Sequence, residues 1–209
     1  MPDYPRPMTA ADPGQLGLRE RTRLAVQQDI AAVALRLFLA RGFDEVTVDA
    51  IAREAGISPR SFFRYFATKE DVVLGRVVEA GHRVERALAA RPGQESAWTA
   101  LRAALSVLVD EPAGSREDEL ALARMSLASP SLRARELEKR TEWERLLVPH
   151  LGARLRPRPL DRKAPDPRAA AIVATTLACL HVATLAWVAT DGVSDLVELF
   201  DEALGAVRG

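Results

Sequence analysis

Hydrophobic residues recur at helical spacing along most of this chain. Between residues 18 and 41 they fall at i, i+3, i+4, i+7 and i+8, on Ile30, Val33, Ala34, Leu37 and Phe38. This stripe predicts a helix with one buried face. Similar stripes continue to residue 207, and no segment alternates with the period of two that strands require. The pattern predicts an all-α fold of about nine helices.

Capping residues and helix breakers set the expected helix ends. Thr47 is expected to cap a short helix that stops at Gly56, and Ser58-Pro59 to open the next, which reaches about Phe66. Thr68 is expected to cap a fourth helix, ending near residues 91–93. Further helices are predicted over 96–110, 117–128, 131–151, 168–190 and 193–207, with a loop of four prolines at 155–167.

The two short helices joined by residues 55–58 have the sequence form of a helix-turn-helix, in which the second helix enters the DNA major groove. On a helical wheel Phe62 and Phe66 lie together and are expected to pack inward. Arg60, Ser61 and Arg64 then lie on the opposite face. The alternative interpretation is that the two phenylalanines are ordinary core residues and the two arginines ordinary solvent-exposed residues without a ligand.

Charge favours the DNA-binding interpretation locally. The whole chain is neutral, with 29 basic and 29 acidic residues, yet residues 55–69 contain three basic residues and no acidic one. Arg60 and Arg64 are predicted to contact guanine, where each good bidentate contact gives roughly 1–3 kcal/mol of discrimination. Thr47 and Lys69, near helix N-termini, are predicted to contact phosphates.

The segment FDEVTVDAIAREAGISPRSFFRYFATKEDVV, residues 43–73, resembles the DNA-binding signature of the TetR family of bacterial transcriptional regulators. The matching positions are Thr47, Ala52, Ala55-Gly56, Ser58, Tyr65-Phe66 and Lys69-Glu70. The resemblance implies a homodimer bound to a palindromic operator. It places phosphate contacts on Thr47, Tyr65 and Lys69, and base or groove contacts on Ser58, Pro59, Arg60, Ser61 and Phe63.

Two positions depart from the family's pattern, and one contact is added to it. Phe63 stands where the family usually has tyrosine, so ring packing replaces a phenol that could bond a phosphate. Pro59 occupies a position that is often polar. Arg64 comes from the helical wheel and not from the resemblance.

The expected organisation has three parts: a disordered arm at 1–17, a DNA-binding domain at 18–68, and a ligand-binding and dimerisation domain at 69–209. The arm contains four prolines and no apolar run, so it is expected to be neither a signal peptide nor a membrane anchor. With Cys179 as its single cysteine the chain has no internal disulfide, and the cytoplasm is the expected location.

The stretch 169–190 has no charged side chain and is long enough to span a bilayer. Its many small residues instead favour close helix packing in a bundle shared by two chains. Together with the stripe at Val193, Leu196, Val197, Phe200 and Leu204, this predicts a two-fold dimer contact. No association with a membrane is expected.

Six residues are candidates for an effector pocket because they are polar or aromatic on otherwise apolar segments: Trp98, Arg102, Arg124, Met125, Trp143 and His181. For each, a place in the core or at the surface is the alternative. Residues 119–147 also resemble the C-terminal domain of mycofactocin-associated regulators. That resemblance implies a fatty acyl or acyl-CoA effector.

These observations favour a dimeric transcriptional repressor that a small hydrophobic molecule releases from its operator. One alternative is a helical interaction or membrane-associated protein without operator binding. The other is an enzyme, but the sequence shows no paired carboxylates, activated nucleophile, phosphate loop or metal-ligand spacing. No cofactor and no metal are expected.

Overall fold

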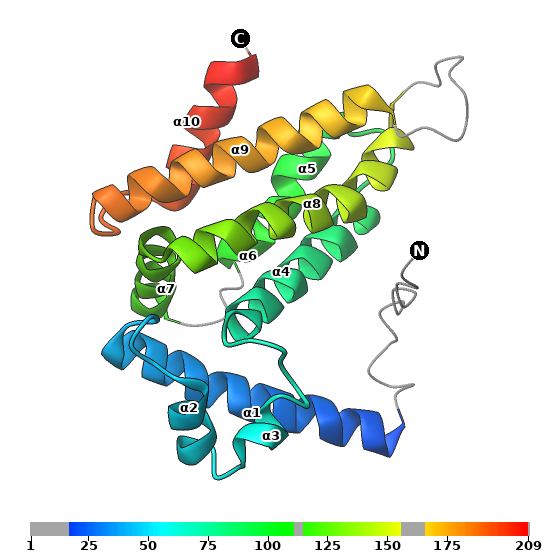
Figure 1. Ribbon diagram of the computed structural model, residues 1–209. Helices are drawn as coiled ribbons and strands as arrows, with labels where there is room; N and C mark the ends of the chain where they lie inside the picture. Colours follow the sequence, from blue (N-terminus) through cyan, green and yellow to red (C-terminus); the bar gives the residue numbers. More distant parts are fainter. Residues whose placement is uncertain (1–16, 111–114, 156–165, 209) are drawn as a thin grey trace.

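The computed structural model describes residues 17–110, 115–155 and 166–208, and all the regular elements in these ranges are helices (Figure 1). The helices are α1 (Leu18–Arg41), α2 (Val48–Glu54), α3 (Pro59–Phe62), α4 (Glu70–Ala90), α5 (Ala97–Leu105), α6 (Val107–Asp110), α7 (Arg116–Ala128), α8 (Pro130–Gly152), α9 (Pro167–Ala189) and α10 (Leu196–Arg208). The all-α prediction is confirmed. Residues 1–16 of the predicted arm and 156–165 of the predicted loop lie outside the described residues.

Side-chain caps fix the helix starts of the N-terminal third. The Thr47 hydroxyl accepts the Ala50 N–H at 3.2 Å, and the Ser58 hydroxyl accepts the Ser61 N–H at 3.1 Å. Thr68 and Asp71 cap each other, because each side-chain oxygen accepts the backbone N–H of the other residue, at 3.3 and 2.8 Å. All three predicted caps are confirmed.

The predicted helix at 96–110 is divided into α5 and α6. The break falls at Ser106, whose hydroxyl donates to the Ala103 carbonyl at 3.1 Å and so competes for an oxygen of the last turn. The last helix also begins later than predicted, at Leu196, because Asp195 caps it by accepting the N–H groups of Val197 and Glu198.

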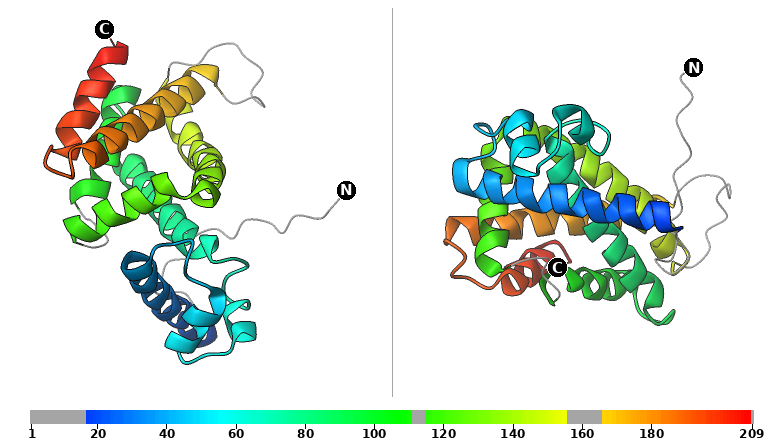
Figure 2. Two further views of the ribbon diagram at one scale, coloured as in Figure 1. Left: turned by 60° about the vertical axis from the view of Figure 1, so that its left-hand side comes forward. Right: turned by 90° about the horizontal axis from the view of Figure 1, so that it is seen from below.

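The C-terminal bundle consists of α4–α10, and its core lies between α4, α5, α8, α9 and α10. The pairs α4 with α8 and α9 with α10 make the most extensive contacts, and the two views of Figure 2 show both pairs side by side. Fully buried aliphatic side chains of α4, α5, α8 and α9 meet there, including Val84, Leu101, Leu147, Leu151 and Val173.

The N-terminal head consists of α1–α3, and its core takes in residues from far along the chain. Phe38, Ile51 and Phe62 are almost completely buried in it. The same cluster contains Leu122 from α7 and Leu132 from α8. The head is therefore completed by side chains of the C-terminal bundle, with two valines of α4 among them.

Helix α7 also holds the turn between α9 and α10. Arg116 donates to the carbonyl oxygens of Gly192 and Ser194 at 2.7 and 3.0 Å, and Arg124 pairs with Asp191. Gly192 has φ +74°, a backbone conformation that favours glycine, and the Leu120 side chain packs over it, 2.9 Å from where a Cβ would lie. One helix thus links the core of the head to the α9–α10 turn.

Helix α9 is the one helix of the described residues that is long and apolar enough to cross a membrane, with a mean hydropathy of 1.9. Only a third of that stretch is buried within the chain. Val182 and Leu185 are 55% and 42% exposed on its outer face. The helix therefore packs one face into the bundle and leaves the other apolar face uncovered in the single chain.

Candidate DNA-binding site

The second helix of the helix-turn-helix is anchored by two phenylalanines. Phe62 and Phe66 are 0% and 5% exposed, and their ring centroids lie 5.4 Å apart. Gly56, with φ +67°, makes the turn that separates this helix from α2. Burying these rings fixes which face of α3 remains outside, and the inward packing expected from the wheel is confirmed.

The outer face of α3 and of the turn after it has the predicted composition. Pro59, Arg60, Phe63 and Arg64 are exposed, and Phe63 is 55% exposed. Ser61 is half-buried. A cationic and apolar surface of this kind can enter the major groove, where guanidinium groups bond base edges and an apolar ring meets thymine methyl groups.

Local contacts already orient part of this face. The hydroxyls of Ser58 and Ser61 are 3.0 Å apart. The Arg64 guanidinium donates to the Tyr65 hydroxyl at 3.3 Å and lies 5.2 Å from the centre of its ring. Arg60 makes no ion pair with any residue of the described ranges. Its guanidinium is thus available to a ligand.

Thr47 and Lys69 were both expected at the phosphates, and the structure gives them different surroundings. Thr47 is exposed at the start of α2, and its hydroxyl keeps a donor while its oxygen caps the helix. The Lys69 ammonium instead donates to the carbonyl oxygens of Phe43, Asp44 and Val46 at 2.8, 3.3 and 3.0 Å. Lys69 therefore holds the α1–α2 turn against the start of α4.

Two of the six effector candidates lie at a surface hollow of about 430 Å³ between α5 and α10. Arg102 lines it and forms a bidentate pair with Asp201, at 2.8 and 2.5 Å, and this hydrogen bonding lowers the pKa of Asp201. The Trp98 ring is next to the hollow, with the Arg208 guanidinium 5.8 Å from its centre.

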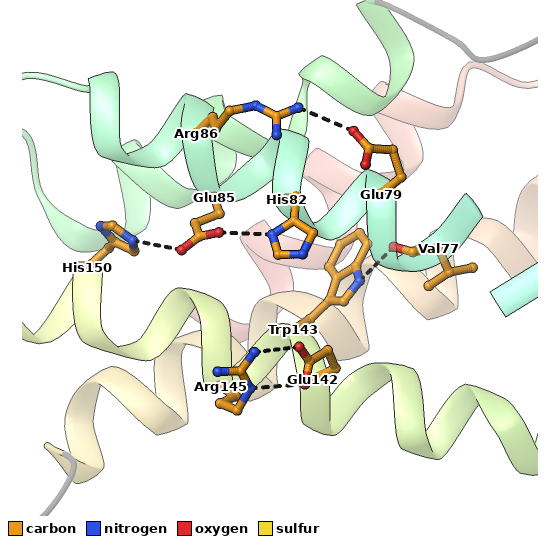
Figure 3. Close-up of polar contacts among 9 residues, drawn as sticks. All are labelled: Val77, Glu79, His82, Glu85, Arg86, Glu142, Trp143, Arg145 and His150. Atoms are coloured by element: carbon orange, nitrogen blue, oxygen red, sulfur yellow. Dashed lines mark hydrogen bonds and ion pairs between the residues drawn. The ribbon is translucent and has the colours of Figure 1, made fainter. Parts of the chain in front are cut away.

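The other four candidates lie elsewhere. Met125 lines a second hollow, of about 400 Å³, between the head and α7, and Arg124 is paired with Asp191. Trp143 is 3% exposed and donates to the Val77 carbonyl at 3.0 Å (Figure 3). His181 is exposed on α9. The structure does not bring the six residues together in one cavity.

A polar cluster that the sequence analysis did not single out joins α4 to α8 (Figure 3). The Glu85 carboxylate lies 3.2 Å from His82 Nδ1 and 3.3 Å from His150 Nε2. Glu142 and Arg145 pair beside it, and this hydrogen bond lowers the pKa of Glu142. Only the His82–Glu85 spacing of one turn could have signalled it. In the part of the chain that the structure describes, no group of three or more histidine, cysteine, aspartate or glutamate residues is arranged to hold a metal.

The anchored helix, its cationic face and the helical bundle behind it define a helix-turn-helix transcriptional regulator. Residues 30–75 match the family model for bacterial regulatory proteins of the tetR family, and residues 95–209 match the model of the MftR C-terminal domain. The chain belongs to the TetR family. Members of this family are transcriptional regulators rather than enzymes.

A characterised relative and two solved structures agree with this assignment. The HTH-type transcriptional regulator TcmR of Streptomyces glaucescens is 34% identical over 154 residues, covering 71% of this chain and 68% of TcmR. Thermus thermophilus FadR, a TetR-family repressor solved with lauroyl-CoA, is 26% identical with a TM-score of 0.53, covering 85% of this chain and 91% of FadR. Bacillus subtilis FadR, solved with stearoyl-CoA, has the same fold, with 19% identity, a TM-score of 0.56, and coverage of 85% and 95%.

Proposed function

We propose that this protein is a cytoplasmic, homodimeric repressor that binds a palindromic operator and leaves it when a small hydrophobic effector binds. The observation that carries the proposal is the exposed cationic face of α3, held outward by the burial of Phe62 and Phe66. Arg60 and Arg64 contact base edges in the major groove, together with Ser58, Pro59, Ser61 and Phe63. Thr47 and Tyr65 contact the flanking phosphates.

Lys69 has a positioning role in this proposal. Its three bonded carbonyls belong to the turn that leads into α2, so the ammonium fixes α2 relative to α4. The helix dipole and N–H groups at the start of α2 are thereby kept where a phosphate can approach them. Lys69 thus supports the phosphate contact without making it.

Dimerisation is assigned to the outer face of α9 together with α10. The uncovered apolar side chains of α9, Val182 and Leu185 among them, face outward from the single chain. Small residues along the same helix let a second helix approach closely. A two-fold contact of this kind places two copies of α3 about one turn of DNA apart, or a multiple of it.

The effector is assigned to the C-terminal bundle, and a fatty acyl or acyl-CoA compound is the class we favour. Support comes from the match to the MftR C-terminal domain and from the two FadR structures that contain acyl-CoA. An effector that binds the released conformation more tightly lowers operator affinity by the same factor, because the linkage is reciprocal. Differential binding of about 10²-fold requires roughly 2.7 kcal/mol.

The test uses DNA protection upstream of the protein's own or neighbouring gene to define the operator, followed by affinity measurements. Arg60→Ala is expected to weaken operator binding by about 1–3 kcal/mol and to leave nonspecific affinity nearly unchanged. Arg133→Ala, an exposed arginine of α8, is the matched control. Equal operator affinity of Arg60→Ala and the parent protein would contradict the base contact.

The dimer has its own test. Leu185→Glu places a charge on the outer face of α9 and is expected to give a monomer in analytical ultracentrifugation and to reduce operator affinity. Glu117→Gln, on the exposed side of α7, is a conservative surface control away from α9 and α10. A parent protein that is monomeric at micromolar concentration, or that sediments with lipid vesicles, would contradict the dimer.

A further inference from the structure

The first two turns of α1 project beyond the packed part of the head. All of residues 18–25 except Glu20 are exposed, and the first buried side chain of α1 is that of Ile30. The match to the tetR family model also begins at residue 30. At ~1.5 Å per residue, the projecting turns extend the head by roughly 12 Å.

This projection is positively charged. Arg19, Arg21 and Arg23 stand against the single acid Glu20, a net charge of +2 within a neutral chain. None of the three arginines forms an ion pair with another described residue. Exposed, unpaired guanidinium groups on one short helix segment are complementary to a row of phosphates.

The three arginines point to two different sides of α1. At 100° per residue, Arg19 and Arg23 are about 40° apart and continue the stripe of Ile30, Ala34 and Leu37. That stripe packs toward the interior of the head, where α1 contacts α2 and α4. Arg21 lies about 160° from both, on the solvent side. Arg19 and Arg23 therefore overhang the side of α1 on which α2 and α4 pack.

The projecting turns lie on the same face of the molecule as α2 and α3. Seen from below, α1 crosses the front of the molecule with α2 and α3 beside it, and the C-terminal bundle lies behind (Figure 2, right). In Figure 1 the same three helices form the end of the molecule opposite α9 and α10. DNA bound by α3 would pass this face and meet the projecting end of α1 beyond the half-site.

We infer that Arg19 and Arg23 contact the phosphates of the DNA that immediately flanks the half-site. The inference rests on the proposed DNA binding and adds a second, sequence-independent surface to it. At 3.4 Å of duplex axis per phosphate of one strand, the length of the projection corresponds to roughly three to four nucleotides. Phosphate contacts of this type add affinity and fix orientation without selecting bases.

The experiment compares Arg19→Ala/Arg23→Ala with Arg21→Ala and the parent protein on two operator fragments, one with native flanks and one trimmed to the palindrome. Affinity is measured by fluorescence anisotropy across a salt series. Each protomer of the dimer loses two phosphate contacts, four in all, which lowers the slope of log K against log salt by about 3.6. On the flanked fragment in 0.1 M salt the double variant is expected to bind at least tenfold more weakly, whereas Arg21→Ala binds nearly as the parent does.

Trimming the flanks is expected to weaken the parent protein and Arg21→Ala but to leave the double variant unchanged, because its flank contacts are already gone. Equal slopes for the double variant and Arg21→Ala, or a flank effect that persists in the double variant, would overturn the inference while operator binding stands. Failure of the proposed function looks different, since the parent protein would then not discriminate the operator from scrambled DNA at all. The melting temperatures of all variants are expected to match that of the parent, because the three arginine side chains are exposed and lie outside the core.

Discussion

Replacing Lys69 by methionine tests whether its ammonium positions the α1–α2 turn or contacts a phosphate. A phosphate contact predicts that Lys69→Met flattens the salt dependence of DNA binding and leaves folding stability intact. The structure predicts the opposite order of effects, because the ammonium donates to three carbonyls of the α1–α2 turn and lies 4.5 Å from the centre of the Phe43 ring. Methionine keeps the apolar stem but removes the donor.

The expected loss of stability follows from these bonds. A hydrogen bond to a charged group contributes roughly 1.5–3 kcal/mol, and since the three share one half-buried ammonium that water can partly replace, we expect about 2–3 kcal/mol in total. For a chain of this size that lowers the melting temperature by roughly 4–12 °C. Differential scanning calorimetry measures it, with the exposed Arg53→Met of α2 as the control.

The DNA-binding readout completes this prediction. Lys69→Met is expected to weaken operator binding through a displaced α2 while the salt slope stays within about half a unit of the parent's, less than the ~1.8 of one phosphate contact in each protomer. An unchanged melting temperature combined with a slope lower by ~1.8 would refute the positioning role and restore the phosphate contact.

Three further predictions concern stability, reactivity and pH. Gly81→Ala is expected to lower the melting temperature, because its Cβ would lie 2.6 Å from a buried indole nitrogen and overpacking costs about 1–3 kcal/mol. Gly75→Ala in the same helix meets nothing within 4 Å and is expected to raise the free energy of unfolding by up to ~1 kcal/mol. Equal shifts in the melting temperatures of the two variants would refute this. Cys179 is 5% exposed, and burial raises the pKa of its thiol, so alkylation at pH 8 is expected only after unfolding; rapid labelling of the native protein would contradict it. The pKa of Asp166 is lowered to about 2 by its hydrogen bond to the guanidinium of Arg168. The stability that this carboxylate adds at the start of α9 is therefore complete above the ordinary pKa of 3.8 and is lost as pH falls through about 2. An NMR titration midpoint near 4 for Asp166 would contradict this.

Local signals in the sequence predicted where the helices of the head begin, but α3 ends at Phe62 rather than near Phe66, because residues 63–65 form a turn. The caps at Thr47, Ser58 and Thr68 involve residues three apart, so the sequence alone contains both partners of each hydrogen bond. The inward packing of Phe62 and Phe66 follows from helical period alone. The division between α5 and α6 was missed, because a serine inside an apolar run is compatible with a continuous helix as well as with a break.

Tertiary placement was beyond such signals. The carbonyls that hold Lys69 lie 23 to 26 residues earlier in the chain, and no periodicity reports them. Likewise, each effector candidate was selected because it is polar or aromatic on an apolar segment. That property does not show which helices pack against each other or which of their faces are in contact. Trp143 proved to be a core residue, and Arg124 half of an ion pair at the α9–α10 turn.

The presence of Leu122 and Leu132 in the core of the head has a consequence for building hybrid regulators. A cut after α4 would leave two vacancies in the interior of the head, and at ~2–5 kcal/mol for a leucine removed from a core such a graft would be poorly folded. A cut after α3 would remove two core valines as well. An exchange of operator specificity therefore has to carry matching side chains at these two sites of α7 and α8, or else replace only the outer face of α3.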